Sequence, residues 1–229
     1  MKTMRYLWLS LLALGACNKE QPLPTCTGAC TTIRGRLLTG QPQVGLAGVQ
    51  VVAKWFKPVG ANYNVREKAR TATNADGTYE LNFHIADDEL GNGFCEAVYQ
   101  VNRNQFYTIG EPVDAFYRVK RDTTLTAWPF LIPRKAHLKL VLASPGVVNG
   151  DYLANDFSTC YGHNTVYSRN VQDGTRVVWP NQLLTYDLEM AGDQSILVRN
   201  QKQKNGLYST SIDSLFIPAG TTKVYNIAY

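Results

Sequence analysis

Apolar side chains recur at every second position through most of the chain after Thr31, and this alternation limits the fold more than any other feature. The apolar members of four such runs are Val49, Val51, Ala53 and Trp55; Tyr79, Leu81, Phe83 and Ile85; Leu138, Leu140 and Leu142; and Leu184, Tyr186, Leu188 and Met190. A period of two buries one face of a β-strand and leaves the other in water. No segment shows helical periodicity over three turns, so the sequence predicts an all-β fold.

Turn signals separate these runs. Asn205-Gly206 lies between two strand-like stretches, and this dipeptide favours a tight hairpin because both central residues take positive φ. Asp76-Gly77 is expected to close a second hairpin, between the strand that ends at Thr73 and the strand that follows the turn. The chain is therefore expected to fold through short strands joined by tight turns.

A boundary between two domains is predicted near the prolines at positions 129 and 133, because two prolines so close together cannot both donate to a central strand ladder. The flanking segments, residues 31–128 and 135–229, each have about the 100 residues of a small sandwich. We therefore expect an N-terminal β-sandwich followed by a second β-sandwich-like domain.

The N-terminus reads as an export signal. A basic start is followed by an apolar run over residues 6–14 and then by Leu-Gly-Ala before Cys17. This arrangement resembles the bacterial lipoprotein signal, which implies removal of residues 1–16 and lipidation of Cys17. The polar, proline-containing residues 17–30 are expected to act as a tether. The expected location is the cell envelope, on an outer membrane, at its periplasmic side or at the cell surface.

The five cysteines suggest how the exported chain is cross-linked. With Cys17 lipidated, Cys26, Cys30, Cys95 and Cys160 remain, and an even number in an oxidising compartment predicts two disulfides. We expect Cys26–Cys30 and Cys95–Cys160, with Cys30–Cys95 as the alternative. A zinc site is disfavoured, since there is no CxxC pair and there are three histidines in all. No cofactor is expected.

Three segments of the first half carry a more specific pattern. They read Ile33-Arg34-Gly35-Arg36-Leu37, Gly45-Leu46-Ala47-Gly48-Val49-Gln50-Val51 and Thr71-Ala72-Thr73-Asn74-Ala75-Asp76-Gly77-Thr78-Tyr79-Glu80-Leu81. This pattern resembles the carboxypeptidase regulatory-like domain, a transthyretin-like, Ig-like β-sandwich, over residues 31–101, although the second segment lacks the usual proline. In carboxypeptidases that domain is an appendage to the catalytic part. The resemblance therefore implies a fold and no peptidase activity.

Two groups of residues have side-chain types that are suited to chemistry. The acidic run Asp87-Asp88-Glu89 is suited to a divalent cation, but an exposed acidic loop is the preferred interpretation. Cys160 and His163 have the residue types of a nucleophile and its base, but the cysteine of an exported protein is expected in a disulfide. Because the chain also lacks a G-x-S-x-G elbow, we expect no enzymatic activity.

Aromatic residues outside the regular alternation are candidates for binding. Tyr63, Tyr107 and Tyr161, together with His163, lie in predicted loops or at their margins. Exposed tyrosines on loops offer an apolar ring and a polar tip, which suits contacts with sugars or proteins. These four residues form the predicted binding set.

The expected function is a non-catalytic binding or structural role for a lipid-anchored envelope protein. The formal charge is +5, and it falls to +3 when Lys2 and Arg5 leave with the signal, which is too small to indicate nucleic acid. The expected partners are the membrane, through the lipid, and a glycan or an envelope protein. The alternatives are a glycan- or peptide-binding accessory of an outer-membrane uptake system and, from another class, a small envelope hydrolase.

Overall fold

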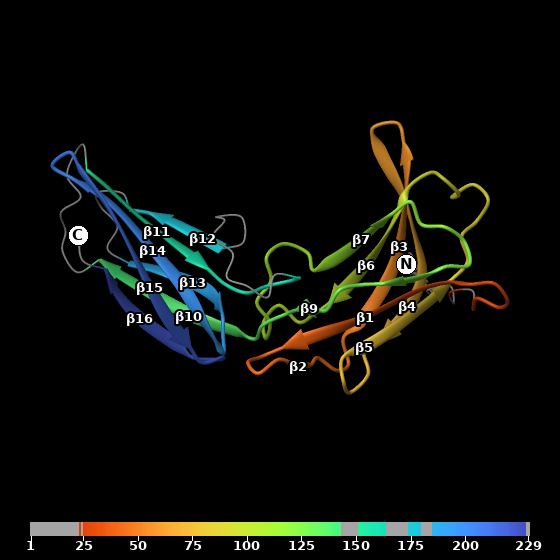
Figure 1. The fold of residues 1–229 in the computed structure, drawn as a ribbon, viewed down its shortest axis with the longest axis horizontal. Helices are drawn as coiled ribbons and strands as arrows, with labels where there is room; N and C mark the ends of the chain where they lie inside the picture. The colour runs from red at the N-terminus through yellow and green to blue at the C-terminus, as the bar shows by residue number, and fades with distance from the viewer. Residues whose placement is uncertain (1–22, 24, 143–150, 164–173, 180–184, 228–229) are drawn as a thin grey trace, which may run out of the picture.

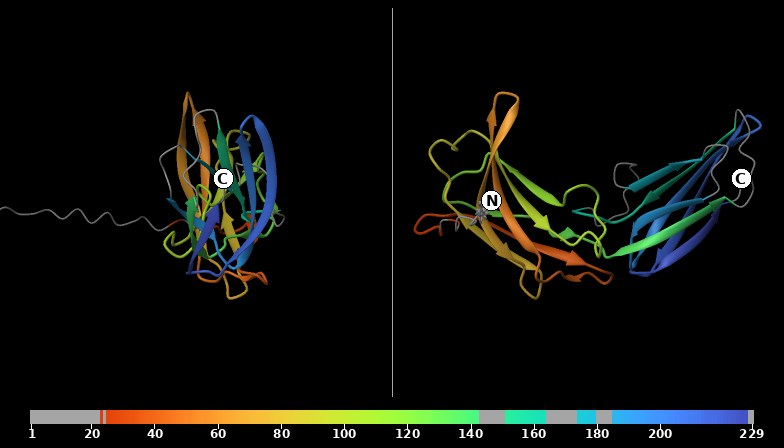
Figure 2. Two further views of the ribbon diagram at one scale, coloured as in Figure 1. Left: turned by 90° about the vertical axis from the view of Figure 1, so that its left-hand side faces the viewer. Right: turned by 180° about the vertical axis from the view of Figure 1, so that it is seen from behind.

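The computed structural model describes residues 23, 25–142, 151–163, 174–179 and 185–227. Every regular element in these residues is a β-strand, and the strands form two lobes side by side (Figure 1; Figure 2 shows two further views). The predicted all-β fold is confirmed. Within this part of the chain, no helix is long and apolar enough to cross a membrane.

The first lobe is built from two sheets. Its strands are β1 (Thr31–Thr39), β2 (Val44–Gly45), β3 (Gln50–Val59), β4 (Asn62–Ala72), β5 (Thr78–Phe83), β6 (Phe94–Gln100), β7 (Val113–Tyr117), β8 (Thr124–Thr126) and β9 (Phe130–Leu131). One sheet has the order β2-β1-β5, with β8 and β9 also paired to β1, and the other has the order β4-β3-β6-β7. The pairs are antiparallel except for β8 and β9, which run parallel to β1.

The inner faces of these two sheets share one hydrophobic core. Its largest side chains include Trp55 from β3, Tyr79 and Phe83 from β5, and Tyr99 from β6, each at most 3% exposed. Residues on either side of Trp55 along β3 alternate inward and outward, as the sequence pattern predicts. The core ends with Ile132, so the short strand β9 belongs to the first lobe.

The second lobe repeats the two-sheet arrangement with new strands. They are β10 (Lys135–Leu142), β11 (Tyr152–Ser158), β12 (Gly174–Val178), β13 (Thr185–Ala191), β14 (Gln194–Lys204), β15 (Leu207–Ile217) and β16 (Thr222–Ile227). The sheets have the orders β13-β10-β16 and β12-β11-β14-β15. Leu138 and Leu140 from β10 pack with Phe157 from β11 in a second core. The predicted turn at Asn205 and Gly206 joins β14 to β15, and both residues have positive φ (51° and 76°), so this hairpin is confirmed.

The other predicted hairpin is wrong in one respect. A turn does lie at Asp76-Gly77, where the Gly77 N–H donates to the Asn74 carbonyl oxygen over 2.9 Å. The flanking strands β4 and β5, however, belong to different sheets, because β4 pairs with β3 and β5 pairs with β1. Thr73 still pairs with Val49 through its backbone before the chain crosses over. The turn therefore carries the chain between the layers of the sandwich.

One of the two predicted disulfides is present. Cys26 and Cys30 are bonded, with their Cα atoms 6.0 Å apart. The predicted Cys95–Cys160 bridge and its alternative Cys30–Cys95 are wrong, because Cys95 and Cys160 are both buried thiols. Cys95 lies in the first core on β6, whereas Cys160 packs in a separate small cluster with Leu38 and Leu131. Desolvation raises the pKa of the Cys95 thiol to about 12, so this thiol stays protonated.

The two lobes are joined by backbone pairing on two sides of the connecting segment. After β11 the chain returns to the first lobe, where the N–H groups of Leu131 and Gly162 each donate to the other's carbonyl oxygen (2.8 and 2.9 Å). On the other side, Tyr107 N–H donates to the Pro133 carbonyl oxygen over 2.9 Å. These contacts hold the junction in place beyond the covalent link between β9 and β10.

The crossover turn predicts a sharp difference between two glycine substitutions. A Cβ atom at Gly77 (φ +83°) would lie 2.2 Å from the Leu37 carbonyl oxygen, whereas one at Gly60 (φ +60°) meets nothing within 4 Å. We expect Gly77→Ala to lower the free energy of unfolding by about 3 kcal/mol or more, and Gly60→Ala by about 1 kcal/mol, the cost of a left-handed alanine. Urea denaturation followed by circular dichroism measures both. Equal losses in the two variants would contradict this account of the turn.

Candidate functional site

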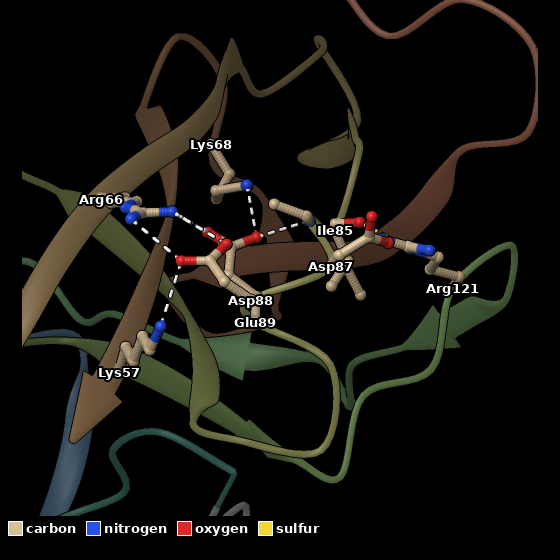
Figure 3. A network of polar contacts seen from close by, with 9 residues as sticks. Lys57, Arg66, Lys68, Ile85, Asp87, Asp88, Glu89 and Arg121 are labelled. Atoms are coloured by element: carbon tan, nitrogen blue, oxygen red, sulfur yellow. Dashed lines mark hydrogen bonds and ion pairs between the residues drawn. The ribbon is translucent and has the colours of Figure 1, made fainter.

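The acidic run Asp87-Asp88-Glu89 between β5 and β6 forms ion pairs with basic residues (Figure 3). Glu89 has a fully buried side chain, although an exposed loop was predicted, and its carboxylate accepts hydrogen bonds from Lys68 Nζ over 2.7 Å and Ala86 N–H over 2.8 Å. Arg66 lies 3.4 Å from the same carboxylate. The exposed-loop prediction is therefore wrong for Glu89, because its side chain is buried against two cationic residues of β4, Arg66 and Lys68.

The two other acids of the run also have basic partners. Asp88 lies 3.0 Å from Lys57 and 3.2 Å from Arg66, and these hydrogen bonds hold the pKa of its carboxyl below the ordinary value. Asp87 pairs with Arg121 over 2.5 Å. Each carboxylate of the run is thus compensated by a cation of the chain itself. In the described residues, no group of three His, Cys, Asp or Glu side chains is arranged to hold a metal ion.

His163 lies at the exposed end of a chain of polar contacts that starts in the first core. Its Nε2 atom contacts Oδ1 of Asp114, whose Oδ2 accepts a hydrogen bond from the Tyr99 hydroxyl over 2.6 Å. The Tyr99 and Tyr79 hydroxyls lie 2.9 Å apart. Burial raises the pKa of the Cys160 thiol, and the imidazole is directed at Asp114. This geometry is unlike an activated nucleophile and its base, which would need a lowered thiol pKa.

Three of the predicted binding residues meet at the junction of the lobes. The rings of Tyr161 and His163 lie against Phe130, with centroids 5.6 and 5.1 Å from it, and Tyr107 lies 6.4 Å from Tyr161. Tyr107 is buried and Tyr161 is half-buried. These rings therefore pack the two lobes together, while the fourth predicted residue, Tyr63, lies elsewhere on β4.

Tyr63 belongs to a row of apolar side chains on the outer face of the sheet β4-β3-β6-β7. Across this sheet, Val65 pairs with Phe56, Phe56 with Phe94, and Phe94 with Tyr117. Trp55, Cys95 and Phe116, the neighbours of the row on β3, β6 and β7, pack in the first core, so the row lies on the opposite, solvent-facing side of the sheet. We call these five residues the aromatic row, and it is the candidate functional site.

The rings of the aromatic row cover one another. Phe56 and Phe94 are stacked with centroids 5.0 Å apart and planes 5° from parallel, and Tyr117 lies 5.2 Å from Phe94. Tyr63 stands edge-on to both phenylalanines, at 6.2 and 5.7 Å. The ends of the row are the most open, since Tyr63 is 56% and Tyr117 is 70% exposed. The row thus presents ring edges and two tyrosines to solvent.

Charged side chains border the aromatic row. One step along the same face, Lys54 of β3 pairs in register with Glu96 of β6 and Glu67 of β4. Burial and the nearby Glu111 raise the pKa of Glu96. An aromatic centre with a charged border is the usual composition of a protein contact surface.

Sequence reasoning identified Tyr63 and missed the rest of the aromatic row. The signal available was an aromatic residue at the outward position of a strand, such as Phe56 directly after the inward Trp55. Phe94 and Tyr117 carry the same signal at the ends of β6 and β7. Strand register is what turns these separate residues into one surface.

Comparisons with known proteins give distant likenesses. No family model matches the chain, and no curated protein matches it. Among solved structures, it is similar to the shaft pilin SpaA from Lactobacillus rhamnosus GG, with 10% identity, TM-score 0.33, and coverage of 87% of this chain and 98% of that one. The minor pilin GBS52 of Streptococcus agalactiae has 11% identity, TM-score 0.30, and coverage of 86% and 94%.

A third likeness is to the Bacillus anthracis TIE protein, with 10% identity and TM-score 0.31. It covers 88% of this chain, which spans about a third (34%) of the length of that protein. At such TM-scores these likenesses carry no conclusion about what this chain binds or does.

The buried acid of the run gives a prediction for stability. Glu89→Gln keeps the shape of the side chain but leaves Lys68, whose side chain is 14% exposed, without its counter-charge. We expect the free energy of unfolding to fall by about 3 kcal/mol. Asp87→Asn is the matched control, because the Asp87 side chain is 94% exposed and should change stability little. Urea denaturation of both variants is the measurement, and an unchanged midpoint for Glu89→Gln would show that the ion pair does not hold the loop.

Proposed function

We propose that this chain is a lipid-anchored, exported protein of the cell envelope that binds a partner and catalyses no reaction. The anchoring rests on the signal-like N-terminus and Cys17, which lie outside the described residues. The binding role rests on one observation, the solvent-facing aromatic row of the first lobe. A large apolar group at a surface position gains free energy when a partner covers it.

The partner that we propose is another protein of the envelope. A sugar ring stacks on a free aromatic face, but Phe56 and Phe94 each cover a face of the other. Ring edges and tyrosine tips, bordered by Lys54 and Glu96, instead suit protein side chains and backbone. Tyrosine is also among the residues that contribute most to binding at protein interfaces.

We also propose that the first lobe is a carboxypeptidase regulatory-like domain acting as a scaffold. The three segments of the sequence pattern fall on β1, on β2 with β3, and on the crossing from β4 to β5. Gly48 and Gly77 of that pattern have φ values of +72° and +83°, which glycine adopts without strain. In this role the sandwich supplies a rigid face for the aromatic row.

Site-specific photocrosslinking in intact cells tests the binding surface. A photoreactive phenylalanine at Tyr117 or Tyr63 is expected to form a protein adduct, because both side chains lie at the open ends of the row. The same probe at Lys139, an exposed position of β10 in the second lobe, serves as the control. Adducts no stronger at positions 117 and 63 than at 139 would refute the proposed surface. An adduct with polysaccharide would instead favour the glycan alternative.

The anchor has a separate test that does not depend on the partner. Cys17→Ser is expected to move the chain from the detergent phase to the aqueous phase in a detergent phase separation, because acyl chains provide the membrane affinity. Cys26→Ser removes the disulfide of the tether but leaves Cys17 intact, so this control should stay in the detergent phase. Retention of the Cys17→Ser variant in the detergent phase would contradict lipidation at this residue.

A further inference from the structure

Strand β15 is an open edge of the second lobe. It lies at the end of the sheet β12-β11-β14-β15, and in the described part of the chain β14 is its only strand partner (Figure 1). Its residues from Leu207 to Ser214 are all exposed. Soluble proteins usually protect such an edge with lysine, proline or a bulge. β15 contains no lysine, no proline and no register shift, and Asp213 is its single charged residue.

Two side-chain contacts reveal which backbone groups of β15 face away from β14. Lys223 Nζ donates to the carbonyl oxygen of Phe216 over 3.0 Å, and the N–H of Ser214 donates to Asp213 Oδ1 over 2.7 Å. In an antiparallel pair, alternate residues point both backbone groups outward. The open positions are therefore the even-numbered ones, and the two nearest the end of the strand are capped by side chains.

Three even-numbered positions remain uncapped, namely Tyr208, Thr210 and Ile212. No described side chain bonds to their outward N–H or carbonyl groups. Unpaired backbone groups in a row are a template for a further strand. The uncapped stretch is symmetric about Thr210, with an exposed large side chain two residues away on each side.

We propose that β15 pairs antiparallel with β15 of a second copy of this chain, about a two-fold axis through Thr210. In this register Thr210 lies opposite its own counterpart, and Tyr208 lies opposite Ile212 on both sides of the axis. All three are outward positions, so the pairing forms about six backbone hydrogen bonds. An axis through Ser209 or Ser211 would pair only two of the three uncapped positions with each other, and it would form about four.

The side chains of the strand favour the same register. Leu215 and Ile217 point into the core, so Tyr208 and Ile212 point to the outer face, where they are 62% and 57% exposed. The pairing covers both residues, and pairs of aromatic and β-branched side chains across strands stabilise sheets. Asp213 lies opposite Leu207, so no like charges face each other. An isologous contact of this kind closes as a dimer.

The groove beside β15 supplies a place for the inward side chains of the added strand. A hollow of about 300 Å³ is lined by the β15 residues Ser209, Thr210 and Ser211, by the end of β16 and by Leu153 of β11. Side chains of the second copy at odd-numbered positions would lie over this hollow. The surface involved is distinct from the aromatic row, which lies on the first lobe.

The register can be tested by introducing opposite charges at positions 208 and 212 of the full chain. Dimerisation of the variants in detergent is then measured by sedimentation. Tyr208→Lys alone and Ile212→Glu alone should each weaken dimerisation about tenfold or more, because each puts a charge opposite an apolar side chain. Combining the two substitutions should restore dimerisation, since the introduced ammonium then faces the introduced carboxylate of the other copy. The two positions lie four residues apart along one strand, too far to pair within one chain. A monomeric parent chain, or a double variant as weak as the single ones, would overturn the proposal.

Cysteine cross-linking provides a readout that does not rely on affinity. The Cα atoms of Thr210 and its counterpart would lie about 5.5 Å apart in a hydrogen-bonded pair, within the range that a disulfide spans. Thr210→Cys should therefore form a disulfide-linked dimer, whereas Ser211→Cys, which faces position 209 of the other copy, should not. Equal cross-linking of both variants, or capture of a different protein by Thr210→Cys, would refute self-pairing at this edge.

Discussion

The structure depends on the constraint that each sheet buries one face, because side chains on a strand alternate between its two faces. In the first lobe the buried faces meet around Trp55 and Phe83, and in the second lobe around Leu140 and Phe157. The residue next to a core residue therefore points outward, as Phe56 does after Trp55. The aromatic row and the exposed side chains of β15 both consist of such outward-pointing residues, on strands that the cores hold in place.

Two buried carboxylates of the first lobe are satisfied by partners distant in sequence. Glu89 ties the loop after β5 to Lys68 on β4, and Asp114 links Tyr99 in the first core to His163 at the junction. A buried carboxylate without such partners would be costly, so these contacts fix the loop and the junction. Residues whose types suggested metal binding or catalysis thus serve to hold segments against the sheets.

Much of the fold could be predicted from local patterns, and the failures have one cause. The period of two and the positive-φ turn at Asn205 depend only on neighbouring residues. The bridge between Cys95 and Cys160, and the pairing of the strands around Asp76, required knowing which distant segments lie together. Cys95 faces the first core and Cys160 packs at the junction, so their chemistry alone did not reveal their separation.

The candidate site, like the fold, could be predicted only in part from local patterns. Tyr63 was recognisable as an aromatic residue outside the alternation, but Phe56, Phe94 and Tyr117 join it only through the register of four strands. The sequence by itself determined which side chains strands such as β5 and β10 bury, because a period of two is a local property of the chain. Only the tertiary structure decided which outward rings stand side by side and which strand is left at an edge, because strand pairing brings together residues far apart in the sequence.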